Sequence, residues 1–183
     1  MKASPKILLA LTAVATLSIA YPAKANLITN GGFETGDFSG WSVSGPASVE
    51  GTVGSIPPHS GNFQAQLDVS ASIGQTLATT PGQVYLIDLW AAAPMIQGGS
   101  LFVFWNGIPA AGFAQSSVTP YEELCPSVIA TSASTTLLFE VTRGRILLDD
   151  ISVNRFVPDG GSTVSLLGCA LLGLAAFRRK LRC

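Results

Sequence analysis

The sequence predicts an all-β fold, an antiparallel β-sandwich, for the region between residues 26 and 156. We count about eight to ten strand-like segments in this region, and turn residues (Gly, Pro, Asn) separate them at regular spacing. No segment shows the apolar periodicity of an amphipathic helix, and there is no internal repeat. Many short strands with frequent turns and without helices are typical of a β-sandwich.

Two kinds of sequence pattern predict the strands. Residues 63–69 alternate apolar and polar side chains, as a half-buried strand does, whereas residues 83–93 are almost continuously apolar and are expected at the centre of a sheet. Asn106-Gly107 is the strongest hairpin signal, and Gly144 is expected to turn the chain into the last strand. The expected strands lie around residue 43 and within 49–53, 63–69, 72–79, 83–93, 101–105, 121–130, 135–141 and 145–156, with 121–130 and 135–141 paired around a turn at 131–134.

The N-terminal segment has the pattern of a secretory signal peptide. Lys2 and Lys6 precede an apolar run over residues 7–20, and Ala-Lys-Ala at 23–25 supplies a small-x-small cleavage site. We therefore expect a signal-peptide helix over residues 1–25 and an exported chain that begins at Asn26.

The C-terminal segment is also apolar and ends in a basic cluster. Residues 163–177 form the apolar run, and Arg178-Arg179-Lys180-Leu181-Arg182 follows it. About fifteen residues at 1.5 Å rise cover only about 22 Å, which is short for a full membrane span. The basic cluster would mark the cytoplasmic side. The alternative is a buried core helix, which the abrupt positive end disfavours.

The start of this segment carries a specific resemblance. Val157-Pro158-Asp159-Gly160-Gly161, the brief apolar run and the Arg-rich end resemble the PEP-CTERM sorting tails of Gram-negative bacteria, and most closely the VPDSG variant, with glycine in place of the serine. The resemblance covers residues 157–183. It implies an inner-membrane anchor recognised by an exosortase-type sorting enzyme, and a mature protein at the cell envelope or in the extracellular matrix.

The composition of the central region excludes one function class. Residues 26–156 contain three arginines, no lysine and ten acidic residues, a formal charge of −7, which the nearly neutral whole chain conceals. Nucleic-acid binding requires a basic face and is excluded. Cys125 is the single cysteine of this region, so an internal disulfide is impossible there, and we interpret it as an idle or buried thiol.

Glu34 is the first candidate ligand of a cation. It follows Phe33 within a glycine-rich segment, residues 26–41, where tight turns bring backbone carbonyls close to a carboxylate. Carboxylate and carbonyl oxygens are the ligands that calcium prefers. The alternative interpretation is a solvated turn carboxylate.

Asp149 is the second candidate. The period of two along a strand places it on one face with Leu147 and Ile151, toward the core. A buried carboxylate needs a partner, because an unpaired buried charge is too costly. Either Arg143 or Arg145 would pair with it, or a cation shared with Glu34 would.

Six short motifs, in order along residues 26–153, resemble the galactose-binding-like jelly rolls that form many carbohydrate-binding modules. They are Asn-Gly-Gly-Phe-Glu at 30–34 with Gly-Trp at 40–41, Ser-Gly-Asn-Phe at 60–63, Ile-Gly-Gln-Thr-Leu at 73–77, Pro-Gly-Gln-Val-Tyr at 81–85 and Leu-Asp-Asp-Ile-Ser-Val at 148–153. The resemblance implies a jelly-roll sandwich.

The same resemblance implies a structural calcium where the first loop meets the last strand. Carried over to this sequence, its ligands would be Glu34 and Asp149, with Asp150 less favoured because it faces the other way. Backbone carbonyls from the Asn30 loop and near Gly61 would complete the site.

Sugar binding in such modules uses aromatic faces together with amide and carboxylate hydrogen bonds. For each aromatic side chain the alternative is core packing, which is our interpretation of Trp41. The candidate ligand-binding residues are Tyr85, Asp88, Trp90, Trp105, Asn106 and Tyr121, with Gln97 nearby.

These observations favour a non-catalytic exported protein that binds polysaccharide. Adjacent carboxylates such as Glu122-Glu123 point to opposite faces of a strand, which is unsuitable for an acid–base pair. The sequence also lacks a nucleophile elbow, a metal-protease helix and a phosphate-binding loop. The alternatives are a structural or adhesion protein of the matrix, which binds proteins or itself, and a small glycan hydrolase.

Overall fold

The computed structural model describes residues 26–156, which form ten strands and no helix. The predicted signal peptide, sorting motif and terminal helices lie outside these residues, and none of the described residues belongs to a helix that would span a membrane. The strands are β1 (Ser42–Ser44), β2 (Ala47–Glu50), β3 (Gln64–Asp68), β4 (Ser72–Ala78), β5 (Val84–Ala93), β6 (Gly99–Trp105), β7 (Ile108–Gln115), β8 (Thr119–Leu124), β9 (Ser127–Ile129) and β10 (Ser134–Arg155).

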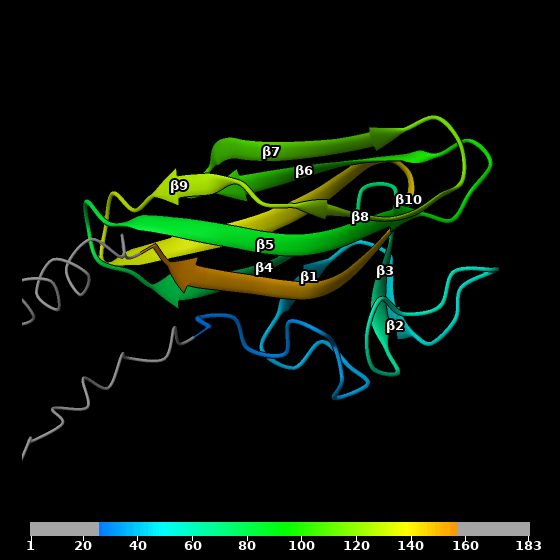
Figure 1. The fold of residues 1–183 in the computed structure, drawn as a ribbon, viewed down its shortest axis with the longest axis horizontal. Helices are drawn as coiled ribbons and strands as arrows, with labels where there is room; N and C mark the ends of the chain where they lie inside the picture. The colour runs from blue at the N-terminus through cyan, green and yellow to red at the C-terminus, as the bar shows by residue number, and fades with distance from the viewer. Residues whose placement is uncertain (1–25, 157–183) are drawn as a thin grey trace, which may run out of the picture.

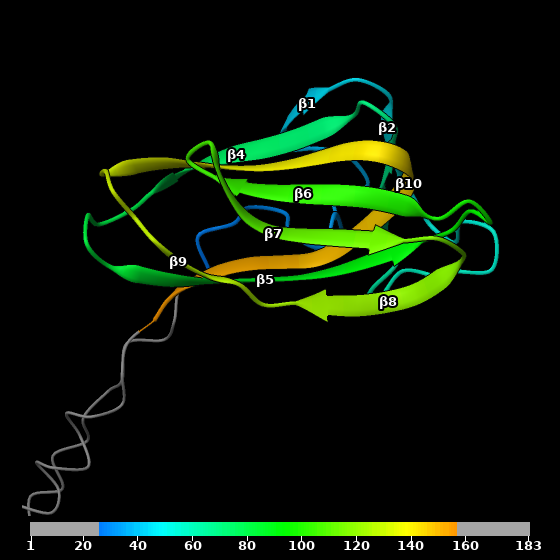
Figure 2. The same ribbon diagram turned by 90° about the horizontal axis from the view of Figure 1, so that it is seen from above.

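The strands form two facing antiparallel layers (Figures 1 and 2), as the sequence predicts. The first sheet has the order β1-β4-β10-β6-β7. The second has the order β2-β3-β10-β5, and β5 then pairs with both β8 and β9. The predicted central position of residues 83–93 is confirmed, because β5 has neighbours on both edges.

β10 belongs to both sheets and connects them. Its first half pairs with β4 and β6, and from Arg145 onward it pairs with β3 and β5. Gly144, with φ of 66°, lies where the strand passes from one sheet to the other. The sequence placed a turn there between two strands; the structure has one bent strand instead.

The hairpin at Asn106-Gly107 is confirmed. It joins β6 to β7, and both residues have positive φ, 52° and 79°. Two such residues make the turn whose twist matches that of the flanking strands.

The predicted pairing of residues 121–130 with 135–141 is wrong. Pro126 has no N–H to donate to a ladder, so the segment divides into β8 and β9 around it. Both strands pair with β5. The turn at 131–134 then carries the chain across to the first sheet, where β10 begins beside β4.

The core lies between the two sheets. Its largest fully buried side chains include Phe33, Phe139, Ile73 and Leu148. Trp41 packs there as expected, stacked on Phe33 with ring centroids 5.7 Å apart. The glycine-rich segment before β1 is therefore anchored by two aromatic rings in the core.

A second, smaller apolar cluster lies on the outer face of the second sheet. Ile56 packs there on Ala92 of β5 and Leu147 of β10. We name residues 51–62, which connect β2 to β3, the 51–62 loop. This loop covers part of a sheet face that would otherwise be exposed, and it positions the candidate site.

Candidate functional site

Asp149 is buried, but not in the core. The prediction that it shares the core-facing side with Ile151 is wrong: Asp149 and Leu147 point to the outer face of the second sheet, beneath the 51–62 loop. A bulge between Asp149 and Ser152, with Asp150 at φ of 49°, shifts the alternation, so Ile151 faces the core.

The partners of Asp149 are backbone N–H groups. Its Oδ2 accepts from His59 N at 2.8 Å and Ser60 N at 3.1 Å, and its Oδ1 accepts from Asp150 N at 2.8 Å. Burial nevertheless raises the pKa of this carboxyl to about 6. The predicted arginine partner is wrong, because Arg145 pairs with Asp68 and Arg143 donates to the Gln115 carbonyl.

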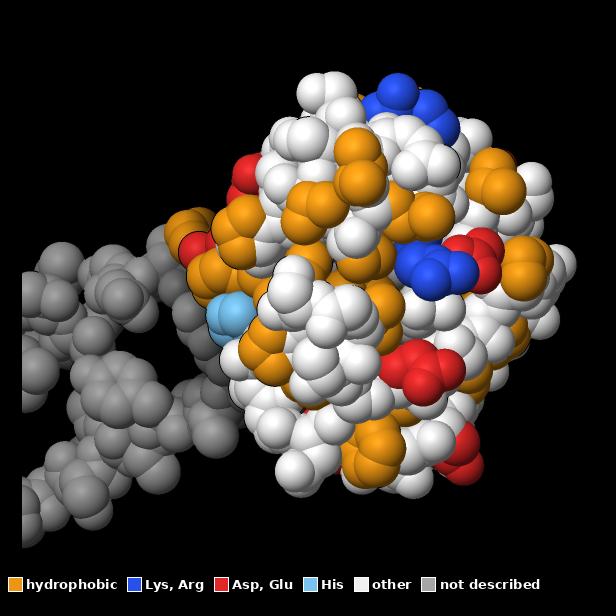
Figure 3. Space-filling model, turned by 90° about the vertical axis from the view of Figure 1, so that its right-hand side faces the viewer, with side chains coloured by type: hydrophobic (Ala, Val, Ile, Leu, Met, Phe, Trp, Pro, Cys, Tyr) orange, Lys and Arg blue, Asp and Glu red, His pale blue; other side chains and the backbone are white. Residues whose placement is uncertain are grey.

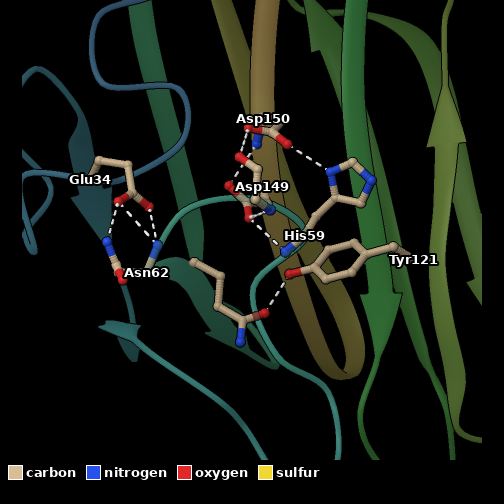
Figure 4. Close-up of polar contacts among 8 residues, drawn as sticks. Glu34, His59, Asn62, Tyr121, Asp149 and Asp150 are labelled. Atoms are coloured by element: carbon tan, nitrogen blue, oxygen red, sulfur yellow. Dashed lines mark hydrogen bonds and ion pairs between the residues drawn. The ribbon is translucent and has the colours of Figure 1, made fainter.

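Asp150 takes part in the same site because of the bulge. Its Oδ2 lies 2.6 Å from His59 Nδ1, and its Oδ1 accepts from the Ser60 hydroxyl at 2.6 Å. The expectation that Asp150 faces away is therefore wrong. Figure 4 shows Asp149 and Asp150 both holding the end of the 51–62 loop.

Glu34 holds the same loop from the other side (Figure 4). Its carboxylate accepts from Asn62 N at 2.9 Å and from Phe63 N at 3.0 Å, and these bonds lower its pKa. The carboxylate lies directly over Gly61, where a Cβ would collide with it. The first segment and the last strand thus meet at one loop, as the motif resemblance implies.

The chemistry of these residues agrees in part with a calcium site. Asp149 Oδ1 and Asp150 Oδ1 lie beside Gly32, but the Glu34 carboxylate is turned toward Gly61. Among the described residues these three do not form a group whose ligand atoms all lie within 4.8 Å of one another. Asn30 does not fit: its side chain donates to the Asp37 carbonyl, and its own carbonyl accepts from Trp41 Nε1. Asn30 is therefore not among the proposed calcium ligands.

Two predicted ligand-binding aromatics lie in the core instead. Tyr85 and Trp105 are 3% and 4% exposed, so neither ring has a face free for a sugar. Their polar atoms also have partners, since the Tyr85 hydroxyl accepts from Thr80 N and Trp105 Nε1 donates to the Ile129 carbonyl. Asn106 is exposed, but in the β6–β7 turn, at the opposite end of the sandwich from the 51–62 loop (Figure 1).

Trp90 and Tyr121 do come together. They line a surface cavity of about 400 Å³ with His59 and the prolines of the 51–62 loop. The His59 ring stacks on Trp90, 3.9 Å between centroids and 15° between planes, and meets Tyr121 edge-on at 5.4 Å. In Figure 3 the histidine is at the surface beside hydrophobic side chains.

Hydrogen bonds fix the wall of this cavity. The Tyr121 hydroxyl donates to Gln64 Oε1, and Gln64 Nε2 donates to the Ile56 carbonyl at 3.2 Å and to the Gly51 carbonyl. Burial raises the pKa of Tyr121, so its hydroxyl stays a donor. Neither Gln64 nor His59 was identified from sequence: the alternation over residues 63–69 predicts a solvent-facing Gln64, and His59 follows two prolines in a segment that resembles a loop.

Asp88 lies on the same sheet face as Trp90, two residues away. The ligand atoms of Asp88, Glu123 and Cys125 all lie within 4.8 Å of one another. Asp88 Oδ1 is buried without a hydrogen-bond partner, and burial and the Glu123 charge raise the Asp88 pKa. Cys125 is an exposed residue, not a buried one. Partial desolvation of its thiol, and then the charges of Asp88 and Glu123, raise its pKa.

The comparisons with solved structures agree on the fold. TmCBM61, solved with β-1,4-galactotriose, has a TM-score of 0.56 at 21% identity over 73% of this chain and 100% of its own. The CBM22-1-GH10 modules of xylanase 10B from Clostridium thermocellum, solved with xylohexaose, score 0.57 at 11% identity over 74% of this chain and 29% of that one. A family 35 carbohydrate-binding module from Clostridium thermocellum has a TM-score of 0.50 at 14% identity, over 64% of this chain and 93% of its own. The described region therefore has the β-sandwich fold of carbohydrate-binding modules.

The sequence comparisons concern the tail. Residues 157–181 match the VPDSG-CTERM motif, which confirms the resemblance of that segment. No curated protein matches the chain in sequence.

Proposed function

We propose that the protein is an exported, non-catalytic glycan-binding module of the cell envelope or extracellular matrix. The observation that carries the proposal is the cavity lined by His59, Trp90 and Tyr121 on a sandwich of this fold. The VPDSG-CTERM motif supports export and handling by an exosortase-type enzyme, with the tail in the membrane before processing.

The cavity has the composition that sugar rings require. Aromatic edges and faces contact the apolar C–H surface of a pyranose, and fixed polar groups bond its hydroxyls. His59 already covers one face of Trp90, so a sugar would lie against Tyr121, the remaining indole surface and Pro57–Pro58. The hydrogen bonds that Asp149 accepts from the loop and that Gln64 donates to it hold the loop in place before the ligand arrives, which limits the ordering cost of binding.

A glycan array probed with the full-length chain tests this proposal. We expect binding to one class of polysaccharide, with the affinity reduced at least about tenfold by Trp90→Ala or Tyr121→Ala. Phe102→Ala is the matched control, because this ring is 44% exposed but lies on the first sheet. Absence of binding to every glycan, or an equal loss in the control, would contradict the proposal.

We also propose that calcium binds at Glu34, Asp149 and Asp150. The support is that Asp149, Asp150 and Glu34 all hold the end of the 51–62 loop, since a cation there would compensate their negative charge. A ligand at about 100 times its dissociation constant stabilises the native state by about 2.7 kcal/mol.

Thermal unfolding with calcium and with a chelator tests this site. We expect a calcium-dependent rise in melting temperature that Glu34→Ala abolishes. Glu140→Ala removes a carboxylate on the first sheet, outside the proposed ligand set, and should leave the rise intact. If calcium causes no shift in the wild-type protein, the site does not exist.

A further inference from the structure

We propose that the ligand of the cavity is a glycan with free amino groups, whose ammonium is received by Asp88 and Glu123. This inference rests on the proposed function and names the chemical class of its ligand. It follows from two carboxylates that lie next to Trp90, beside the residues that line the cavity.

Asp88 and Glu123 lie directly beside Trp90. Glu123 on β8 is the cross-strand partner of Trp90 on β5, and Asp88 is the next side chain of β5 on the same face. Cross-strand neighbours have Cβ atoms about 5 Å apart. A saccharide against Trp90 and Tyr121 would therefore place its next substituent or ring over the two carboxylates.

The two carboxylates lack a compensating positive charge. Burial, the charge of Glu123 and its hydrogen bond, and the charge of Asp150 raise the pKa of Asp88, and only the charge of His59 lowers it. Asp88 Oδ1 is buried and accepts no hydrogen bond. An ammonium group would supply three donors and a positive charge at this position.

The arginines of the described region are engaged elsewhere. Arg145 pairs with Asp68, Arg155 donates to Gln83 Oε1, and Arg143 donates to the Gln115 carbonyl. There is no lysine between residues 26 and 156. A uronic acid at the cavity would meet Asp88, Glu123 and Asp150 with His59 alone to offset them, so anionic glycans are disfavoured.

The test is isothermal titration of the full-length chain, in mild detergent at about pH 5.5, about two units below the ordinary α-amino pKa, so that the amine is protonated. The probes are glucosamine hexasaccharide, N-acetylglucosamine hexasaccharide and a galacturonate oligosaccharide. We expect the amine form to bind at least about tenfold more tightly than the acetylated form, as charge-assisted hydrogen bonds imply. The galacturonate should bind most weakly.

Two double variants with the same change of charge show where the preference arises. Asp88→Asn with Glu123→Gln should remove the preference for the amine, whereas Glu50→Gln with Glu140→Gln should keep it. Near-UV circular dichroism of each variant shows that its core packing is unchanged. Retention of the preference in the Asp88/Glu123 variant, or its equal loss in the control, would overturn the inference.

The probes also separate this inference from the proposed function. If a neutral or acidic glycan binds at least as tightly as the amine form, and its binding depends on Trp90, the inference is refuted. The proposed function, glycan binding at this cavity, then still stands. Failure of every glycan to bind would refute both.

Discussion

Individual carboxylates determine how the 51–62 loop is held. Asp149 is completely buried, accepts three backbone N–H bonds and still has a pKa raised to about 6 by burial. Glu34 is exposed, accepts from the same loop and has a lowered pKa. The two carboxylates thus contribute to stability with opposite dependence on pH.

Asp149 should make the protein less stable as pH rises. Its folded pKa lies above the unfolded value of 3.8, so the native state binds the proton more tightly between these values. The contribution is most favourable below pH 3.8 and is lost as pH rises through about 6. Two pKa units correspond to about 3 kcal/mol.

Urea unfolding of wild type and Asp149→Asn from pH 3.5 to 7, with chelator present, measures this contribution. The free energy of unfolding of the wild type, minus that of the variant, should fall by about 3 kcal/mol as pH rises. Taking the difference cancels the titration of Glu34 and Asp88. Parallel curves for the two proteins would show that the Asp149 pKa is not raised.

At the scale of elements, β10 organises the molecule. It crosses from one sheet to the other at Gly144, and its bulge at Asp149–Ser152 brings two consecutive carboxylates to the same loop. A Cβ on Gly144 would contact the Gly98 carbonyl oxygen, and φ there is 66°. The crossing point therefore requires glycine for two reasons, its backbone angle and the closeness of the neighbouring chain.

Gly144→Ala should destabilise the protein by at least about 2 kcal/mol, from backbone strain and the displaced β6 end. Gly82→Ala is the matched control: φ is 77°, but a Cβ there meets nothing within 4 Å, so only the strain of about 1 kcal/mol applies. Urea denaturation measures both variants. An equal loss in the two would show that the contact with Gly98 is unimportant.

The sequence predicts elements better than it predicts how they pair. Periodicity and turn residues correctly indicate β3, β5, β6 and the hairpin at Asn106-Gly107, because local rules govern them. The crossing of β10 does not follow from periodicity, since it depends on how the two sheets close over each other. The division at Pro126 has a local cause, the missing N–H of proline, which periodicity alone does not register. The bulge at Asp149 is likewise invisible to a strict period of two, which predicts opposite faces for Asp149 and Asp150, whereas both contact the 51–62 loop.

The candidate site was predictable only in part. Glu34, Trp90 and Tyr121 were identified from residue type and resemblance, and the structure brings the last two together. Trp90 lines the cavity whereas Trp105 lies in the core, and residue type alone does not show which face of each strand is covered. His59 stacks on Trp90, 31 positions away, and Gln64 accepts from Tyr121, 57 positions away, and local sequence patterns do not show such contacts.

For the whole molecule, the described ends lie together, away from the candidate site. Leu27 N donates to the Val153 carbonyl at 2.9 Å, and both ends are at the opposite end of the sandwich from the 51–62 loop (Figure 1). A protein attached to the envelope through its C-terminal segment would present the cavity away from the point of attachment. The charge of −7 over residues 26–156 favours solubility and disfavours acidic partners.

Tryptophan fluorescence gives the most direct test that the cavity at Trp90 binds glycan. Of the three tryptophans, Trp41 and Trp105 are 8% and 4% exposed and lie in the core, so a ligand at the cavity would affect Trp90. The full-length chain is titrated with the glucosamine and N-acetylglucosamine hexasaccharides. We predict a saturable change in emission in the wild type that is absent in Trp90→Phe. A saturable change that persists in Trp90→Phe, or no change with any glycan that binds, would contradict the assignment of this cavity as the binding site.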